Sequence, residues 1–200
     1  MSQVNLQDAE LTGERIDIGR NVVYFLGPNL TLRNCTLVLQ IAARNLVIPH
    51  ARFIDCTFVV KRELKGFRWD TAHLQGCRFT GLLSGNDFGE FPRSLGTGSI
   101  EGCDFTETTL QGCRFVGCDA RTLRFPSWPC FTLFDPVRRW RELSAYPWPG
   151  TIGRITIEGL EISPATTAAL TLSAPVLAER HGTTPEAIKA VLEKLDGVFY

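Results

Sequence analysis

The feature that most constrains this chain is a repeat of large apolar residues at a fixed spacing. Internal repeats decide the whole architecture, so they are considered before secondary structure. A shift of 21 residues aligns the columns Leu11, Leu32, Phe53 and Leu74; Ile16, Leu37, Phe58 and Phe79; Phe25, Leu46, Phe67 and Phe88; and, more weakly, Val22, Ala43 and Leu64.

Within each period the apolar residues recur every five residues. Helical side chains recur at about 3.6 residues and strand side chains at 2, so neither element explains this spacing. A chain that turns a corner every five residues forms a square coil, and four sides plus one extra residue complete a turn. Stacked coils then bury what one coil alone leaves exposed. After an interruption near residues 85–98, the pattern resumes from Ile100 to Phe125.

Small residues, often cysteine, stand two positions before the large ones. Cys35, Cys56 and Cys77 follow the same period of 21. The seven cysteines form no C-x2-C pair, which tetrahedral zinc sites usually need. An odd number of cysteines also argues against a disulfide framework, so we expect thiols that fill a narrow interior.

The local phrases resemble pentapeptide-repeat proteins, whose unit is a small residue, a polar residue, Leu or Phe, a polar residue and a variable one. The phrases that carry the resemblance are ARFID, CTFVV, CRFTG, CDFTE and CRFVG, within residues 4 to about 126. The resemblance implies a right-handed quadrilateral parallel β-helix, a mainly β solenoid. It also implies possible dimerisation through C-terminal elements, as in some members.

Residues 126–150 break the pattern with five prolines and six aromatic residues, which indicates an insertion. Within it, Asp135 to Leu143 is expected to form a short helix, with Asp135 as its N-cap. Residues 155–162 alternate apolar and polar side chains, so they are expected to form one further coil.

The last 37 residues, 164–200, are expected to form a helical cap or dimerisation element behind a β-helix domain of residues 1–163. One helix is expected from Ala174 to His181. A second is expected after the capping box at 183–186, with Ile188, Val191, Leu192 and Leu195 on one face. That face either covers the open end of the β-helix or binds a second copy.

Composition narrows the class of partner. Lys plus Arg equals Asp plus Glu at 21 each, so net charge does not drive binding to nucleic acid or to anionic membranes. The chain has no apolar run of about 20 residues and no basic and apolar leader at its start, which predicts a cytoplasmic protein.

Sequence motifs for catalysis are missing. The three histidines, His50, His73 and His181, stand beside no nucleophile or metal pattern, and no phosphate-binding glycine loop is present. The carboxylates Asp55, Asp70, Asp87 and Glu90 are expected on the solvated surface rather than in a polysaccharide-cleaving site, and His73 is also expected to face solvent. We therefore predict a protein that is not an enzyme and holds no cofactor or metal.

Residues 121–150 combine aromatic side chains with a surplus of three positive charges, the composition typical of interface hot spots. The predicted partner-binding residues are Arg121, Arg124, Trp128, Phe131, Phe134, Arg138, Arg139, Trp140, Arg141, Tyr146 and Trp148. The alternative is that these aromatics fold onto the solenoid. A second candidate surface is the ladder of outward charges of both signs along the coils.

The favoured hypothesis is a bacterial immunity-type protein that neutralises a toxin or other protein target by direct binding. The first alternative, which the resemblance brings in, is a DNA mimic that protects DNA gyrase. Such mimicry needs a continuous acidic surface, and the many arginines disfavour it. The second alternative is a β-helix enzyme acting on polysaccharides.

Overall fold

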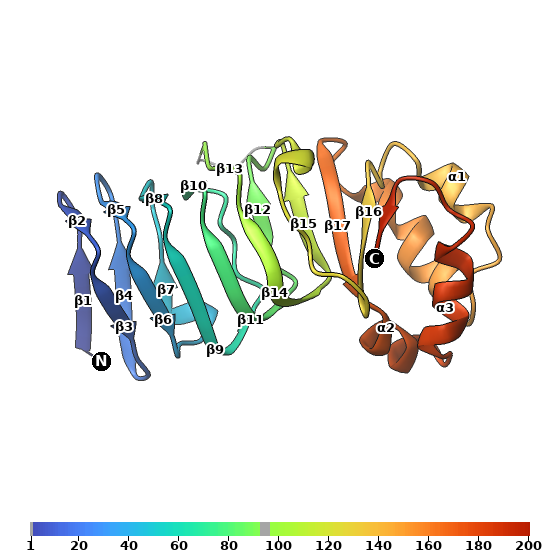
Figure 1. Cartoon of the computed structure of the whole chain (residues 1–200), viewed down its shortest axis with the longest axis horizontal. Helices are drawn as coiled ribbons and strands as arrows, with labels where there is room; N and C mark the ends of the chain where they lie inside the picture. Colours follow the sequence, from blue (N-terminus) through green and yellow to red (C-terminus); the bar gives the residue numbers. More distant parts are fainter. Residues whose placement is uncertain (1, 93–96) are drawn as a thin grey trace.

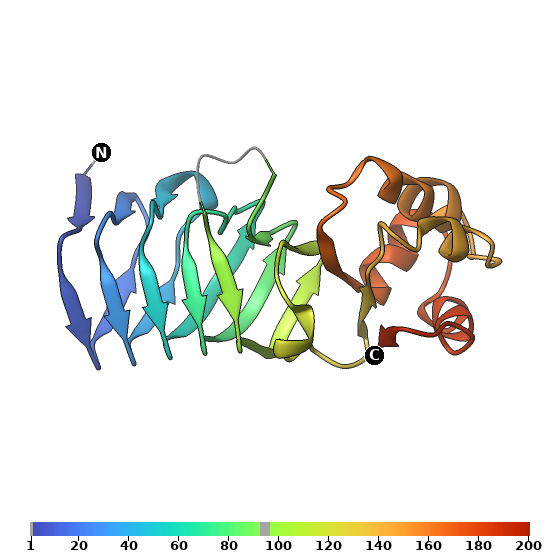
Figure 2. The same ribbon diagram turned by 90° about the horizontal axis from the view of Figure 1, so that it is seen from above.

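The computed structural model describes residues 2–92 and 97–200. Parallel coils stack into a β-solenoid of about four turns, followed by a lobe that holds the helices (Figures 1 and 2). The N-terminal coil and the helical lobe lie at opposite ends of an elongated molecule. Residues 93–96, part of the expected interruption at 85–98, lie outside the described residues.

Strands from successive coils form parallel sheets along the solenoid. One sheet contains β2 (Glu10–Thr12), β5 (Thr31–Arg33), β8 (Arg52–Ile54), β10 (His73–Gln75) and β13 (Ser99–Glu101). A second contains β3 (Arg15–Ile18), β6 (Thr36–Leu39), β9 (Thr57–Lys65), β11 (Arg78–Ser84) and β14 (Asp104–Gln111). A third contains β1 (Ser2–Leu6), β4 (Val22–Leu26) and β7 (Leu46–Val47), before which the short 3-10 turn η1 spans Ala43–Asn45.

The strand pairing confirms the first two columns that the sequence predicts. Leu32 pairs with Leu11 and Phe53, and Leu74 continues that column opposite Phe53. Leu37 likewise pairs with Ile16 and Phe58, and Phe79 lies opposite Phe58. A shift of 21 residues thus places like side chains one above another.

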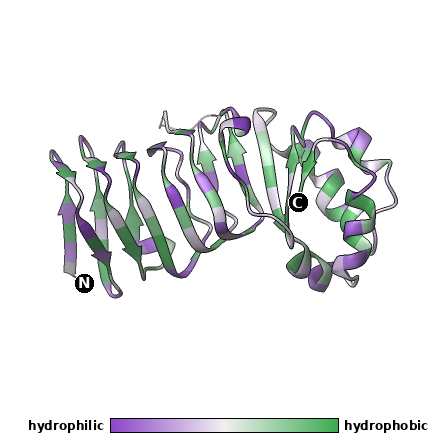
Figure 3. Ribbon diagram, in the orientation of Figure 1, coloured by the Kyte–Doolittle hydropathy of each residue, from purple (hydrophilic) through white to green (hydrophobic). Residues whose placement is uncertain are grey.

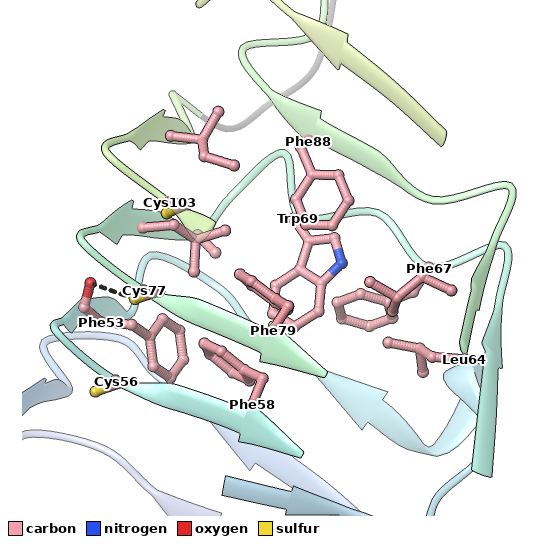
Figure 4. Packing of buried hydrophobic residues seen from close by; sticks show 14 of the residues in the cluster. Phe53, Cys56, Phe58, Leu64, Phe67, Trp69, Cys77, Phe79, Phe88 and Cys103 are labelled. Carbon is pink, nitrogen blue, oxygen red and sulfur yellow. Dashed lines mark hydrogen bonds between the residues drawn. The ribbon is translucent and has the colours of Figure 1, made fainter. Parts of the chain in front are cut away.

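The interior is an aromatic stack (Figure 4). Phe58 and Phe79 lie 4.6 Å apart and nearly parallel, and Phe105 continues the stack 4.7 Å from Phe79. Beside it, Trp69 and Phe88 stack at 5.6 Å. All five side chains are fully buried, so each coil covers the lining of the previous one.

The cysteines form a column inside the solenoid, as predicted. Cys56 and Cys77 are fully buried, and each thiol donates to a backbone carbonyl of the preceding coil, Leu32 and Phe53 respectively, at 3.3 Å. Figure 4 shows the second of these contacts. All seven cysteines are free thiols.

The predicted column Phe25, Leu46, Phe67 and Phe88 is wrong in register. Leu46 pairs with Tyr24 rather than Phe25, and Trp69 rather than Phe67 stacks on Phe88. These sides of the coils contain an extra residue, and 46 minus 24 gives a local repeat of 22 residues. A constant shift of 21 therefore fails there.

Longer strands carry the chain around one corner of the later coils. β9 and β11 pair on both sides of a bulge between Gly81 and Leu83, after which Leu64 lies opposite Leu83. Gly81 has φ +97°, and a Cβ there would collide with the backbone carbonyl of Val60. This glycine lets the strand bend and supply the fourth side of the coil.

The interruption is shorter than residues 85–98. β12 (Asp87–Gly89) still belongs to the solenoid and pairs with β15 (Cys113–Val116), which places Phe88 opposite Phe115. The corner after β15 is the short 3-10 turn η2 (Ala120–Thr122).

The C-terminal end of the solenoid is closed by antiparallel strands. β17 (Thr167–Ser173) pairs with β15, β16 (Cys130–Phe134) pairs with β17, and β18 (Val198–Phe199) pairs with β16. Phe134 and Ala169 pack on the solenoid core. Phe131, Leu133, Leu170 and Leu172 belong to a second core beneath the helices.

Two local predictions in this region need correction. The helix expected from Asp135 to Leu143 is only α1 (Trp140–Ser144), with Arg139 rather than Asp135 at its N-cap. Asp135 has φ +48°, which is incompatible with a helix start at that residue. Residues 155–162 form no further coil: they lie in a π-helical turn, η3 (Gly153–Ile157), and a 3-10 turn, η4 (Glu158–Ile162).

The two predicted helices are present as α2 (Ala174–His181) and α3 (Pro185–Leu192). The N-cap of α3 is Thr184, which accepts from the Ala187 backbone N–H, so the capping box begins one residue later than expected and lacks Glu186. The apolar residues Ile188, Val191, Leu192 and Leu195 are buried in the second core, as the cap interpretation predicts. That helix face is thus occupied within the chain, whereas dimerisation through it stays a prediction.

Hydrophobic residues run along the strands of the solenoid and mix with hydrophilic ones on the helices of the lobe (Figure 3). Within residues 2–92 and 97–200, every helix is too short or too polar to cross a bilayer.

Candidate protein-binding surface

Two of the predicted partner-binding residues are part of the protein interior. Phe131 is fully buried between β16 and the helices, and Trp148 is 8% exposed. The Trp148 indole N–H donates to the Leu143 carbonyl at 2.7 Å. Neither side chain reaches a partner in this structure, which corrects the prediction for both.

Arg139 stabilises the lobe rather than facing a partner. Its guanidinium pairs with Glu142 at 2.6 Å and donates to the Asp196 carbonyl at 2.7 Å and the Gly197 carbonyl at 3.3 Å. The hydrogen bond to Glu142 raises the pKa of Arg139 and lowers that of Glu142. Arg139 therefore ties the segment before α1 to the C-terminal tail.

The other eight predicted residues divide into two groups. Trp128, Phe134, Trp140 and Tyr146 are partly buried and pack against one of the two cores. Arg121, Arg124, Arg138 and Arg141 are exposed. The aromatic side chains thus fold mainly onto the protein itself, which was the alternative interpretation, and the exposed arginines stay candidates.

Asp70 and Asp87 differ from the predicted solvated carboxylates. Both are buried, with side chains 12% and 11% exposed, and each is paired with an arginine. Arg68 lies 2.9 Å from Asp70, and Arg114 binds Asp87 through two contacts of 2.8 and 3.0 Å. Asp55 and Glu90 are exposed, as expected.

His73 is only partly buried, and its Nδ1 lies 3.0 Å from the Ser99 hydroxyl. Burial and the neighbouring Arg52 lower its pKa. In the described residues, no three His, Cys, Asp or Glu side chains converge as a metal site would require.

The ladder of outward charges is largely satisfied within the protein. Arg33 pairs with Glu10 of the preceding coil at 2.7 Å, and Arg78 and Arg124 approach Asp104 at 3.8 and 3.6 Å. Burial, the largest influence on Asp104, favours its neutral form, but hydrogen bonds from Thr106 and the two arginines lower its pKa overall. These side chains offer a partner few unpaired charges.

An apolar hollow beside β17 is the strongest candidate surface, and we call it the β17 groove. It holds about 320 Å³ between β17 and the turns η3 and η4. Its lining consists of Gly112, Arg114, Ile155, Thr156, Gly159, Leu160, Ile162, Ser163, Thr167, Leu170 and Leu172. Ile162 is 91% exposed and Ile155 56%, the largest values among the exposed large hydrophobic residues of the described chain.

Charge and aromatic contacts continue the groove along the solenoid. Arg114 lines the groove and lies opposite Leu170 of β17. Its guanidinium carbon is 5.2 Å from the Phe91 ring centre, and that of Arg68 is 5.0 Å from the same ring. The result is an apolar hollow next to an aromatic ring with two arginines over it, the residue types that dominate binding hot spots.

A second hollow lies where α2 meets the solenoid, and its character is different. It holds about 330 Å³, and its lining includes the charged residues Glu63, Lys65 and Arg180. Exposed apolar side chains favour the β17 groove for protein contact.

The sequence gave no direct signal for the β17 groove. Ile155 and Ile162 belong to a segment that alternates like a strand, and in a further coil alternate residues would have been buried. The only available signal was the apolar composition of that segment. No family model matches the chain, and no curated protein is similar to it in sequence.

Proposed function

We propose that this protein is a non-enzymatic scaffold that binds and neutralises a protein target, as a bacterial immunity-type protein does to a toxin. The observation that carries the proposal is the exposure of Ile155 and Ile162 beside the apolar floor of the β17 groove. Exposed apolar side chains gathered around a hollow mark protein interaction sites more often than single surface residues do.

The energetics support a protein partner for the groove. Burial of one exposed isoleucine contributes about 1.5 to 3 kcal/mol, so covering Ile155 and Ile162 supplies a useful part of a binding free energy. The groove is built on β17, which is hydrogen-bonded to strands on both sides, β15 and β16. Such a rigid base loses little conformational entropy when a partner binds.

The finer assignment of the solenoid is part of the same proposal. We assign it to the pentapeptide-repeat proteins, supported by the stacked columns of large residues and of small cysteines. The seven free thiols are in keeping with the reducing cytoplasm of a bacterium.

The test is stoichiometric co-purification from the native host with matched variants. The tagged protein, an Ile162→Glu variant and an Arg121→Glu control are expressed at native level, and retained proteins are quantified by mass spectrometry. Arg121 is exposed and lies outside the groove, so its variant also introduces a glutamate at a solvent-facing position. We expect one partner retained by the parent and the control, and lost at least about tenfold by Ile162→Glu.

Neutralisation is then measured directly with that partner. Expression of the partner alone should arrest growth, co-expression with the parent protein should restore it, and co-expression with Ile162→Glu should not. Absence of a stoichiometric partner would contradict the proposal. A partner lost by Arg121→Glu but kept by Ile162→Glu would transfer the binding site to the arginines of residues 121–141, and a partner that is harmless alone would exclude neutralisation.

A further inference from the structure

The N-terminal coil has an open edge. β1, β2 and β3 each stand at the end of their sheet, and Figures 1 and 2 show this coil at the end of the solenoid away from the lobe. Such strands present unpaired backbone N–H and C=O groups. The opposite end is covered by β17, β16 and the helices.

The lining of this first coil is incompletely covered. Leu11 and Ile16 are partly exposed, whereas their column neighbours in the next coil, Leu32 and Leu37, are fully buried. The same side chains would be buried if another coil lay on the open edge. The edge therefore has both apolar surface and backbone groups to offer.

The register identifies the backbone groups that face the open edge. In β3, the carbonyls of Glu14 and Ile18 accept from Thr36 and Gln40 of the next coil. Backbone groups alternate along a strand, so those of Arg15 and Asp17 point toward the open edge. The Asp17 carbonyl also accepts a hydrogen bond of 3.2 Å from the Tyr24 hydroxyl, which leaves a second lone pair for a partner strand.

The same alternation holds in β1, on the other side of the coil. The Leu6 carbonyl accepts from Gly27 of the next coil, so Gln3 and Asn5 face the open edge. The two strands lie on opposite sides of the coil because β2 intervenes between them in the chain.

The side chains on both edge strands are complementary to themselves. Arg15 and Asp17 flank Ile16 and pair with each other at 3.0 Å, with side chains 64% and 61% exposed. Gln3 and Asn5 flank Val4 and share a hydrogen bond of 2.8 Å. In an antiparallel pair of two identical strands centred on Ile16, Arg15 of one copy lies directly opposite Asp17 of the other.

We propose that the open edge of the N-terminal coil binds a second copy of this chain, forming a two-fold symmetric, end-to-end dimer. A two-fold axis through Ile16 and Val4 makes both β3 and β1 pair antiparallel with their own copies. Each β3 pair then gains backbone hydrogen bonds between Arg15 and Asp17 in both directions, and two cross-strand ion pairs. The contact is isologous, as two-fold interfaces are.

The test is sedimentation equilibrium of the full chain, with any tag placed at the C-terminus, from about 1 to 500 μM. We expect a monomer to dimer equilibrium. Arg15→Asp places like charges opposite Asp17 twice in the symmetric pair and should weaken dimerisation about tenfold. The swapped double variant Arg15→Asp/Asp17→Arg should restore it. Arg33→Asp, which breaks an ion pair with Glu10 away from the axis, is the control and should dimerise like the parent.

Three results would overturn the proposal. The first is a monomer at every concentration, the second a dimer that Arg15→Asp leaves unchanged, and the third a double variant that stays as weak as Arg15→Asp while circular dichroism shows it folded. A heavier species that increases without limit would indicate open-ended association instead of the closed dimer. The β17 groove is remote from these residues, so its variants test the proposed function separately.

Discussion

The Phe58 and Phe79 rings, which belong to neighbouring coils, lie 4.6 Å apart and within 7° of parallel. Both side chains are fully buried. This stack shows how a narrow solenoid obtains a close-packed interior, since each ring fills the space directly above the previous one.

Truncation of this stack should be costly. Phe79 also contacts Trp69, Phe88 and Phe105, so Phe79→Ala leaves a cavity that its aromatic neighbours cannot fill. We expect a loss of about 3 to 5 kcal/mol in the free energy of unfolding, measured by chemical denaturation. A loss under about 1 kcal/mol would mean that Phe79 does not line a packed interior.

Asn86 is a polar residue that the interior requires. It is fully buried, accepts from the Trp69 indole N–H at 3.1 Å, and donates to the Leu64 and Ser84 carbonyls at 2.7 and 3.0 Å. Asn86→Leu leaves these three groups unpaired and should reduce the free energy of unfolding by at least about 1 to 3 kcal/mol.

The matched control for Asn86 is Asn5→Leu in the exposed edge strand β1, where the amide bonds only Gln3. Its effect should stay within about 0.5 kcal/mol. Equal effects of the two substitutions on the denaturation midpoint would show that the buried hydrogen bonds of Asn86 are not what stabilises the fold.

The cysteines should be unreactive in the folded protein. Burial raises the pKa of Cys113 to about 12, and burial with the nearby Asp119 raises that of Cys118 to about 11. The thiolate is the reactive form, so a disulfide reagent at pH 8 should label the native protein slowly. All seven cysteines should react at once in denaturant. Rapid labelling of several cysteines without denaturant would contradict their burial.

His181 should make stability depend on pH. It is buried in the lobe, with Nδ1 at 2.8 Å from the Thr151 hydroxyl and Nε2 at 3.1 Å from that of Thr156. Burial and the neighbouring Arg180 lower its pKa in the folded protein. The unfolded chain therefore binds the proton first as pH falls below about 6.5, so the contribution of His181 is complete above that pH and is lost toward its folded pKa.

The measurement is the urea midpoint from pH 8 to pH 5 for the parent and for His181→Gln. The glutamine keeps the ability to bond the threonines but does not titrate, so the variant should lose less stability over this range. Because His73 also has a lowered pKa, His73→Gln serves as the comparison. Identical pH profiles of parent and His181→Gln would exclude this role of His181.

The sequence predicted the solenoid because its information is local and periodic. The columns through Leu32 and Leu37 follow from one shift of 21 residues, and the amphipathic face of α3 follows from helical spacing. The column through Leu46 failed because its side of the coil contains an additional residue, which a constant period does not allow.

The C-terminal region was harder to predict because its pairing is non-local. β16 pairs with β17, whose residues follow more than 30 positions later, as in the pair of Cys130 with Ser173. That pairing buries Phe131, which the sequence placed at an interface. It also takes the sheet position that residues 155–162 were expected to fill. The β17 groove arises from this arrangement, so local patterns did not indicate it.

The central claim is that successive coils bury their side chains directly against one another. A double-mutant cycle with Phe58→Leu and Phe79→Leu tests it, and Phe58→Leu with Leu192→Ala, in the separate core of the lobe, is the control. The account predicts a coupling free energy of about 0.5 to 1.5 kcal/mol for the stacked pair and additivity for the control. Additive effects of Phe58→Leu and Phe79→Leu would contradict it.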